Sequence, residues 1–174
     1  FAAHQGRHPC YMKFKMGFDK EGHITAVDFD NLMVGGAYMS WGVVVLFYTA
    51  SMPHLPYVTP AAKFSGKRVY TNTGTCGAHR GLGGAQPRFA MEILMDMAAE
   101  KLGMTPLQIR LLNAVESGHT CRSMMYVPHT EYKKTLQTAA DNCDFENKYG
   151  KLPFGKGIGI SGGYYISGTS YTLY

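Results

Sequence analysis

The densest chemical signal in the sequence is a glycine-rich loop around one arginine, residues 77–86, which reads Gly-Ala-His-Arg-Gly-Leu-Gly-Gly-Ala-Gln. Its glycines let the backbone approach a ligand closely and adopt positive φ angles. The exposed N–H groups of such a loop bind anions, and Arg80 adds a fixed cation with several donors. A tight strand-to-helix turn with a solvent-exposed Arg80 explains the same residues equally well. Both interpretations stay open at this point.

Other sequence motifs for metal, nucleotide or covalent chemistry are weak or missing. Residues 157–162 match the dinucleotide pattern G-x-G-x-x-G, but strand-like residues follow them where that fingerprint requires a helix. The 7 histidines include no H-E-x-x-H pair and the 4 cysteines no C-x-x-C pair, so we expect no metal ligands in this chain. Neither G-x-S-x-G nor a P-loop sequence occurs. We therefore assign no catalytic residue.

Three helices are expected after the loop. The first has Pro87 in its first turn and ends at Gly103, which suits a left-handed C-cap. A second helix starts at Thr105-Pro106, with threonine as N-cap, and a third spans about residues 130–142. The apolar residues expected to face the core are Phe89, Ile93, Leu94, Met97, Ala98 and Leu102 in the first helix, Leu107, Ile109, Leu111 and Leu112 in the second, and Leu136, Ala139 and Ala140 in the third.

Strands are expected on both sides of these helices. Residues 11–30 alternate between polar and apolar side chains around a turn that contains Asp and Gly, which predicts a β-hairpin. Residues 63–72 predict another strand, packed through Phe64, Val69 and Tyr70, and residues 155–174 a glycine-rich strand or hairpin. The order of elements is that of an α+β fold, with β-hairpins and an amphipathic helix pair rather than a regular βαβ alternation.

The segment between the first strands and the loop is expected to be less regular. Residues 31–45 carry glycines and predict irregular structure, and residues 43–52 predict a short helix. The prolines that follow exclude regular structure over the next eight residues. They are Pro53, Pro56 and Pro60.

The bulk composition indicates a folded piece of a larger assembly. The 174 residues are 45% hydrophobic, which suits one domain with a core, and only 17% charged, which suits a surface partly covered by neighbours. The net charge of +5 is spread along the chain, so an anionic cofactor or an acidic partner explains it better than nucleic acid does. The longest apolar stretch, residues 41–47, is too short to span a bilayer. With isolated thiols, we expect a cytoplasmic protein without a membrane segment, one domain fragment over residues 1–174 that is truncated at both ends.

Four segments, in register over nearly the whole chain, resemble the molybdenum hydroxylases: xanthine dehydrogenases, aldehyde oxidoreductases and hydroxybenzoyl-CoA reductases. Residues 6–18 look like the family's G-R-x-P…K-x-G-F hairpin, and residues 28–38 like its D-x-G-A-Y stretch. Residues 80–86 are similar to its R-G-F-G-x-P-Q loop, and residues 100–113 to its L-G-x-D-P-x-x-x-R-x-x-N helix pair. The resemblance implies a fragment of the molybdopterin-binding large subunit.

The resemblance assigns roles to the loop and to one helix residue. It implies that Arg80, Gly81, Gly83, Gly84 and Gln86 bind the cofactor. Leu82 occupies the place of a substrate-packing aromatic, and Tyr48 falls roughly where xanthine-oxidising members carry a substrate-binding arginine. Because a tyrosine cannot replace a guanidinium clamp, xanthine itself is not favoured as the substrate.

The implied activity is hydroxylation of an aldehyde, an N-heterocycle or a related aromatic by water-derived oxygen; a reductive member stays open. The cofactor would be molybdenum-molybdopterin, as such or as the cytosine dinucleotide, with iron-sulfur clusters and FAD on partner subunits or domains of a hetero-oligomer. The family's catalytic glutamate has no match here, so the isolated chain is expected to be inactive. The alternative is a non-catalytic α+β binding or assembly module that keeps only the scaffold.

Overall fold

A three-stranded sheet forms the centre of the chain in the computed structural model, which describes residues 4–166. Its strands lie in the order β1 (Cys10–Phe18), β2 (Ile24–Val34) and β3 (Ala61–Val69). The predicted hairpin is confirmed, because β1 pairs with β2 antiparallel. β3 pairs with β2 in parallel, and such neighbours need a crossover connection. Helix α1 (Gly42–Ser51) supplies it, so the α+β fold contains one βαβ unit that the sequence did not predict.

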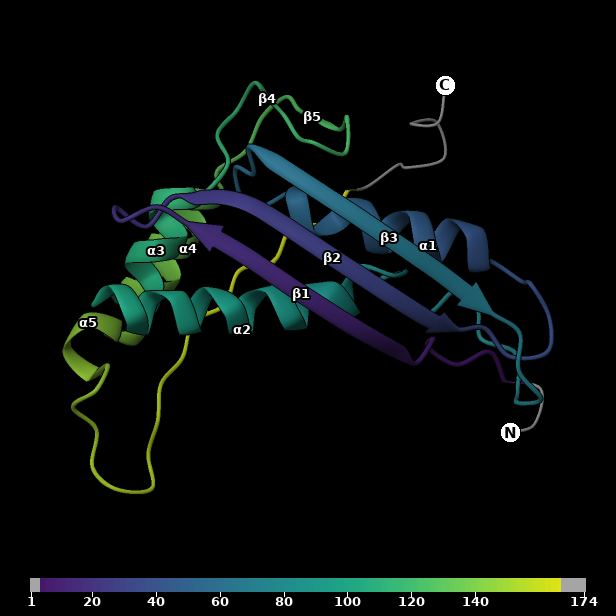
Figure 1. Ribbon diagram of the computed structural model, residues 1–174. Coiled ribbons are helices and arrows are strands. Elements are labelled where there is room, and N and C mark those ends of the chain that lie inside the picture. The colour runs from purple at the N-terminus through teal and green to yellow at the C-terminus, as the bar shows by residue number, and fades with distance from the viewer. Residues whose placement is uncertain (1–3, 167–174) are drawn as a thin grey trace.

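The two faces of the sheet differ in polarity, as the alternation in the sequence requires. On the inner face Phe14 of β1 stacks on Phe29 of β2 with ring centroids 3.8 Å apart. Helix α2 (Ala85–Leu102) lies along β1, and α1 lies along β3 (Figure 1). The outer face carries the exposed side chains of Lys13 and Lys15. The sheet and the two helices therefore form two layers with the hydrophobic core between them.

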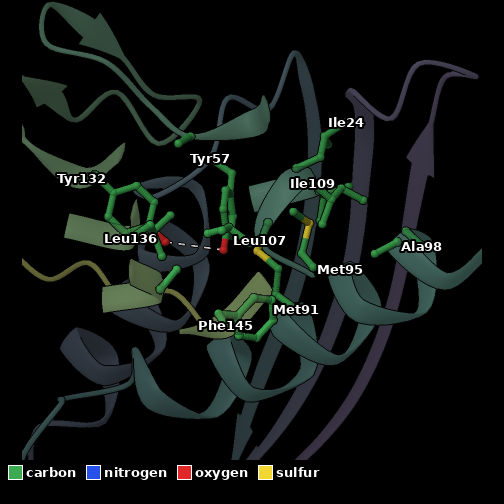
Figure 2. Packing of buried hydrophobic residues seen from close by; sticks show 14 of the residues in the cluster. Ile24, Tyr57, Met91, Met95, Ala98, Leu107, Ile109, Tyr132, Leu136 and Phe145 are labelled. Atoms are coloured by element: carbon green, nitrogen blue, oxygen red, sulfur yellow. Dashed lines mark hydrogen bonds between the residues drawn. The ribbon is translucent and has the colours of Figure 1, made fainter. Parts of the chain in front are cut away.

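The end of α2 and the start of the next helix lie at the predicted signals. Gly103 ends α2 in a left-handed conformation with φ 68°. Thr105 and Gln108 form a reciprocal capping box at the start of α3 (Pro106–Asn113). Helices α4 (Tyr132–Cys143) and α5 (Phe145–Lys148) close one end of the molecule. In Figure 2 side chains from all four helices meet in one apolar cluster, the main core, which includes Met91, Met95, Leu107, Ile109, Leu136 and Phe145.

The predicted core-facing side of α2 is partly wrong. Ala98 is buried and Leu102 packs against the core, as expected, but Phe89 is 69% exposed. Ile93 and Met97 are 45% and 49% exposed, and Met91 and Met95 are buried in their place. Apolar residues lie on more than one side of this helix, so periodicity alone cannot identify the side that faces the core. In α3, Leu107 and Ile109 are buried as predicted, whereas in α4 Ala139 is exposed.

Several predicted element boundaries are also wrong. β2 continues to Val34, because its end pairs with β1 where irregular chain was expected. Met52–His54 form a short 3-10 helix with Pro53 in its first turn, where no regular structure was expected. Two short strands, β4 (His119–Thr120) and β5 (Tyr126–Val127), were not predicted. Of the three residues predicted to pack in and after β3, only Phe64 contacts the core, whereas Val69 and Tyr70 are exposed. Residues 155–166 form no strand, and the rest of the predicted C-terminal strand lies outside the described residues.

A buried ion pair joins α2 to α3. The fully buried Arg110 donates from Nε to Glu92 at 2.8 Å, and its Nη1 lies 2.6 Å from Asp96. Glu92 also accepts from the Tyr57 hydroxyl at 2.7 Å and from the backbone N–H of Gly162 at 2.8 Å. Burial and the Glu92 charge raise the pKa of Tyr57, so its hydroxyl keeps the proton that it donates. We call these residues the Glu92 hub.

Candidate functional site

The loop of residues 77–86 has a backbone that glycine makes possible. Gly81, Leu82 and Gly83 have φ angles of 91°, 25° and 82° in succession. Side chains strain such a backbone, so the loop needs glycine at two of these positions. The N–H groups of Leu82 and Gly84 bond the carbonyls of His79 and Gly81, both at 2.7 Å. Among the described residues, the N–H groups of Gly81 and Gly83 donate to no backbone carbonyl. Because Gly83 is buried against α1, only the N–H of Gly81 is a candidate donor to a ligand.

Helix α1 supports the loop from below. The Thr49 hydroxyl lies 3.0 Å from the carbonyl oxygen of Gly83 and 2.9 Å from that of Val45. A methyl group on Gly83 would collide with the Val45 carbonyl, and one on Gly84 would press against Met52. The glycines therefore serve close packing on α1 as well as backbone freedom. This packing holds the start of α2 in place beneath the loop.

The segment before β1 holds the loop from the other side. Gly77 N–H donates to the Gly6 carbonyl at 3.1 Å, within an isolated bridge between Gly6 and Cys76. Arg7 donates to the carbonyl of Arg80 and lies 2.9 Å from the His79 ring. The Gln86 amide donates to the carbonyl of His8 at 3.2 Å. Residues some 70 positions earlier in the chain thus fix the shape of the loop.

The five residues predicted to bind the cofactor are all brought together in this loop. Arg80 and His79 are exposed, Gly81 and Gln86 are half-buried, and Gly83 and Gly84 are buried against α1. The nearest atoms to a methyl group on Gly81 would belong to Ala85 and Arg7, all at 3.5 Å or more. The backbone at Gly81 is therefore open on one side. Nη1 of Arg7 and Oε1 of Gln86 are buried and have no hydrogen-bond partner among the described residues. A buried polar group without a hydrogen-bond partner lowers the free energy of unfolding by roughly 1–3 kcal/mol. Such groups are rare in folded proteins, so each one is a candidate for a functional role.

The two residues predicted to contact substrate lie together on the inner side of the loop. Leu82 packs against a second hydrophobic cluster, formed by Tyr48, Met52, Leu55, Val115, Cys121 and Val127. Tyr48 is only 5% exposed, and its ring lies 6.4 Å from that of Tyr165. In the described part of the chain Tyr48 is therefore a packing residue first. Its contact with a substrate, like that of Leu82, stays a prediction.

The titratable groups near the loop favour a positively charged site without a reactive thiol. Burial raises the pKa of Cys10 to about 11 and also raises that of Cys76, so both thiols stay protonated at neutral pH. Burial and the Arg68 charge lower the pKa of His8, which is therefore neutral. Residues 4–9 and 73–86 contain no Asp or Glu, so the free charges of this surface are the arginines.

The donor set suits an oxyanion rather than a metal ion. Within residues 4–166 no group of three His, Cys, Asp or Glu side chains is placed to hold a metal. A free backbone N–H, as at Gly81, beside an exposed guanidinium is a donor arrangement that phosphate and other oxyanions prefer. An anionic cofactor that carries its own metal therefore fits these residues. No helix within the same range is long and apolar enough to cross a membrane.

Sequence reasoning found the loop but missed the residues that hold it. Thr49 and Arg7 carry no local pattern that points to residues 77–86. Arg7 belongs to one of the segments that resemble the molybdenum hydroxylases, and that was the one available signal. His79 has no signal of its own in the sequence apart from its place in the loop.

Comparison with known proteins identifies the family of the domain. The family model of the molybdopterin cofactor-binding domain matches residues 1–114. The aldehyde oxidoreductase of Megalodesulfovibrio gigas is 34% identical over 173 residues, which cover 93% of this chain and 18% of the relative. The large molybdopterin subunit of nicotinate dehydrogenase from Eubacterium barkeri is 40% identical over 114 residues, 64% of this chain and 26% of the relative.

Solved structures give the same result for the fold. Aldehyde oxidoreductase from Desulfovibrio gigas superposes with a TM-score of 0.76 at 31% identity, over 82% of this chain and 16% of that one. Quinoline 2-oxidoreductase from Pseudomonas putida 86 superposes with a TM-score of 0.75 at 27% identity, over 82% of this chain and 19% of that one. The chain thus spans about a fifth of the length of the relatives that it matches.

Proposed function

Because this chain belongs to the molybdopterin cofactor-binding domains of the xanthine oxidase family, we propose that its Arg80 loop binds the anionic molybdopterin cofactor within a larger oxidoreductase. The observation that carries the proposal is the loop itself. Gly81 keeps a backbone N–H without a carbonyl partner among the described residues, and the neighbouring Arg80 is exposed. The loop is held from two sides, by Thr49 of α1 and by Arg7, so its donors are preorganised.

The residues of the loop divide the work. Arg80 and the free N–H of Gly81 would hold negative charge, and Gln86 fixes the start of α2 against the His8 carbonyl. Leu82 would border the substrate, with Tyr48 behind it in the second cluster. When bound, the cofactor would supply hydroxylation of a substrate carbon with oxygen from water. A leucine in place of an aromatic favours an aldehyde or a small N-heterocycle, and two relatives are named for an aldehyde and for nicotinate.

The proposal extends to the setting of the reaction. Electrons would leave through iron-sulfur clusters and FAD on partner subunits or domains, in a cytoplasmic hetero-oligomer. The free cysteines of the chain agree with a reducing compartment. The cofactor would be molybdenum-molybdopterin, as such or as its cytosine dinucleotide, and no residue of this chain is assigned to the metal.

Cofactor content tests the proposal. The full-length protein is produced in molybdenum-replete cells, and molybdenum and pterin are measured per chain for the wild type and for Gly81→Val. We expect the valine to remove most of both, because it closes the open side of the loop and strains a φ of 91°. The matched control is Gly118→Val, outside the loop, which has a φ of 87° and no atom within 4 Å of an added Cβ. Wild-type protein without pterin, or with equal content in both variants, would favour the non-catalytic assembly module instead.

A further inference from the structure

The contact between Arg7 and His79 fixes where the histidine carries its proton. Nη2 of Arg7 lies 2.9 Å from Nδ1 of His79. A guanidinium has donors and no acceptor, so in this contact Nδ1 must be the acceptor and must be unprotonated. The neutral ring then carries its proton on Nε2. Arg7 therefore selects one tautomer of His79.

The selected tautomer gives the loop a donor that faces solvent. His79 is exposed, and the next residue is the exposed Arg80. The same Arg7 nitrogen also bonds the Arg80 carbonyl, so one side chain holds both residues in place. The Gly6–Cys76 bridge fixes the backbone next to Arg7. Nη1 of Arg7 is buried and has no hydrogen-bond partner among the described residues. Hydrogen bonding of all its own donors therefore does not explain where the Arg7 guanidinium lies.

We propose that Nε2–H of His79 is a further hydrogen-bond donor to an oxyanion at this loop, with Arg7 as the positioning residue that sets its tautomer. The oxyanion is a phosphate of the cofactor or a carboxylate of the substrate, since both present the same acceptor atoms. The local charge agrees, because residues 73–86 contain no acidic side chain. The inference rests on the proposed function for the identity of the cofactor but not for the tautomer.

Nitrogen NMR of the full-length protein labelled with ¹⁵N-histidine tests the tautomer. The His79 signals are identified by their loss in His79→Gln. In the wild type at mildly alkaline pH, Nδ1 should resonate as an unprotonated nitrogen and Nε2 as a protonated one. In Arg7→Met, which keeps an unbranched apolar stem but has no donors, the ring should populate both tautomers. A protonated Nδ1 in the wild type would overturn the proposal.

Substitutions at His79 test the donor. A glutamine amide reaches the position of Nε2, whereas an asparagine amide reaches only that of Nδ1, and phenylalanine keeps a ring without donors. His79→Gln should weaken oxyanion binding by about two- to threefold. His79→Asn and His79→Phe should weaken it on the order of tenfold, because each removes one charge-assisted hydrogen bond. For a cofactor phosphate the loss is in pterin retained per chain. For a substrate carboxylate it is in KM for carboxylate-bearing substrates relative to neutral aldehydes.

The outcomes separate this inference from the proposed function. Pterin-loaded wild type with no loss in His79→Phe, in either retention or KM, would overturn the role of His79 and leave cofactor binding intact. Wild type without pterin would overturn cofactor binding. Titration with inorganic phosphate then decides the inference: the His79 Nε2 signal should shift in the wild type, and an unmoved signal would refute it.

Discussion

Two arginines lie near opposite parts of α2, and they differ in how their donors are used. Arg110 is fully buried, and its donors meet Glu92, Asp96 and the carbonyl of Pro106. Arg80 is exposed at the entry to the helix, and within residues 4–166 only its backbone carbonyl has a hydrogen-bond partner, Arg7. The polar groups of the Glu92 hub bond one another and stabilise the fold, whereas the side chain of Arg80 remains free to bind a ligand. The residue type alone does not distinguish a structural arginine from a ligand-binding one. The presence or absence of nearby carboxylate partners does.

The largest expected effect comes from breaking the hub. Arg110→Ala leaves Glu92 buried with a charge and without its cation, which should lower the free energy of unfolding by about 3–5 kcal/mol. Denaturant unfolding of the wild type and the variant measures it. Replacing the pair together, with Arg110→Met and Glu92→Leu, should recover much of the loss, because no buried charge remains. A loss below about 1 kcal/mol in the single variant would mean that water already screens Glu92.

Arg80 should show the opposite pattern, a large effect on the reaction and little on the fold. In the full-length, cofactor-loaded protein, Arg80→Ala should lower the rate per bound molybdenum by roughly 30- to 1000-fold, equivalent to about 2–4 kcal/mol of barrier. Arg80→Lys should restore part of it, since lysine keeps the charge but not the planar fork. The thermal midpoint should hardly move. A normal metal-normalised rate in both variants would leave Arg80 as a surface residue of a turn.

The capping signals show why parts of the fold could be predicted from sequence. Thr105 and Gly103 act through contacts within a few residues, so the boundaries of α2 and α3 follow from local chemistry. The inward side of α2 could not be predicted, because Glu92 faces the core only when Arg110 meets it. The loop itself stood out by its glycines. Its support did not, since Arg7 and His79 are 72 positions apart and share no local pattern.

Gly83 joins the ligand-binding loop to its support on α1, and its substitution should have an intermediate effect. Gly83→Ala strains a φ of 82° and meets the Val45 carbonyl, so we expect a loss of about 1–3 kcal/mol in the free energy of unfolding. The matched control is Gly118→Ala, with a φ of 87° and no atom within 4 Å of the added methyl group. The difference between the two isolates the packing on α1. Equal losses would show that backbone strain alone requires glycine at position 83.

The smallest expected effect concerns a polar group that neither region uses. His54 is 6% exposed, and its Nδ1 has no partner among the described residues. Burial lowers its pKa from 6.5 to about 4. Between these values the unfolded chain binds a proton that the folded chain excludes, so stability is lost as the pH falls through this window. At pH 5.5 the loss should be on the order of 1 kcal/mol relative to pH 7.5.

His54→Gln should remove that increment, because glutamine does not titrate. The test compares denaturant unfolding of wild type and variant at both pH values, which cancels the carboxylates that titrate in each. His8 has its pKa lowered in the same direction by burial and Arg68, so some acid sensitivity should remain in the variant. An unchanged pH dependence would show that water or a neighbouring segment already solvates His54. It would then be wrong to treat an unpaired buried group as a cost to the fold, and the unpaired Nη1 of Arg7 would lose the same interpretation.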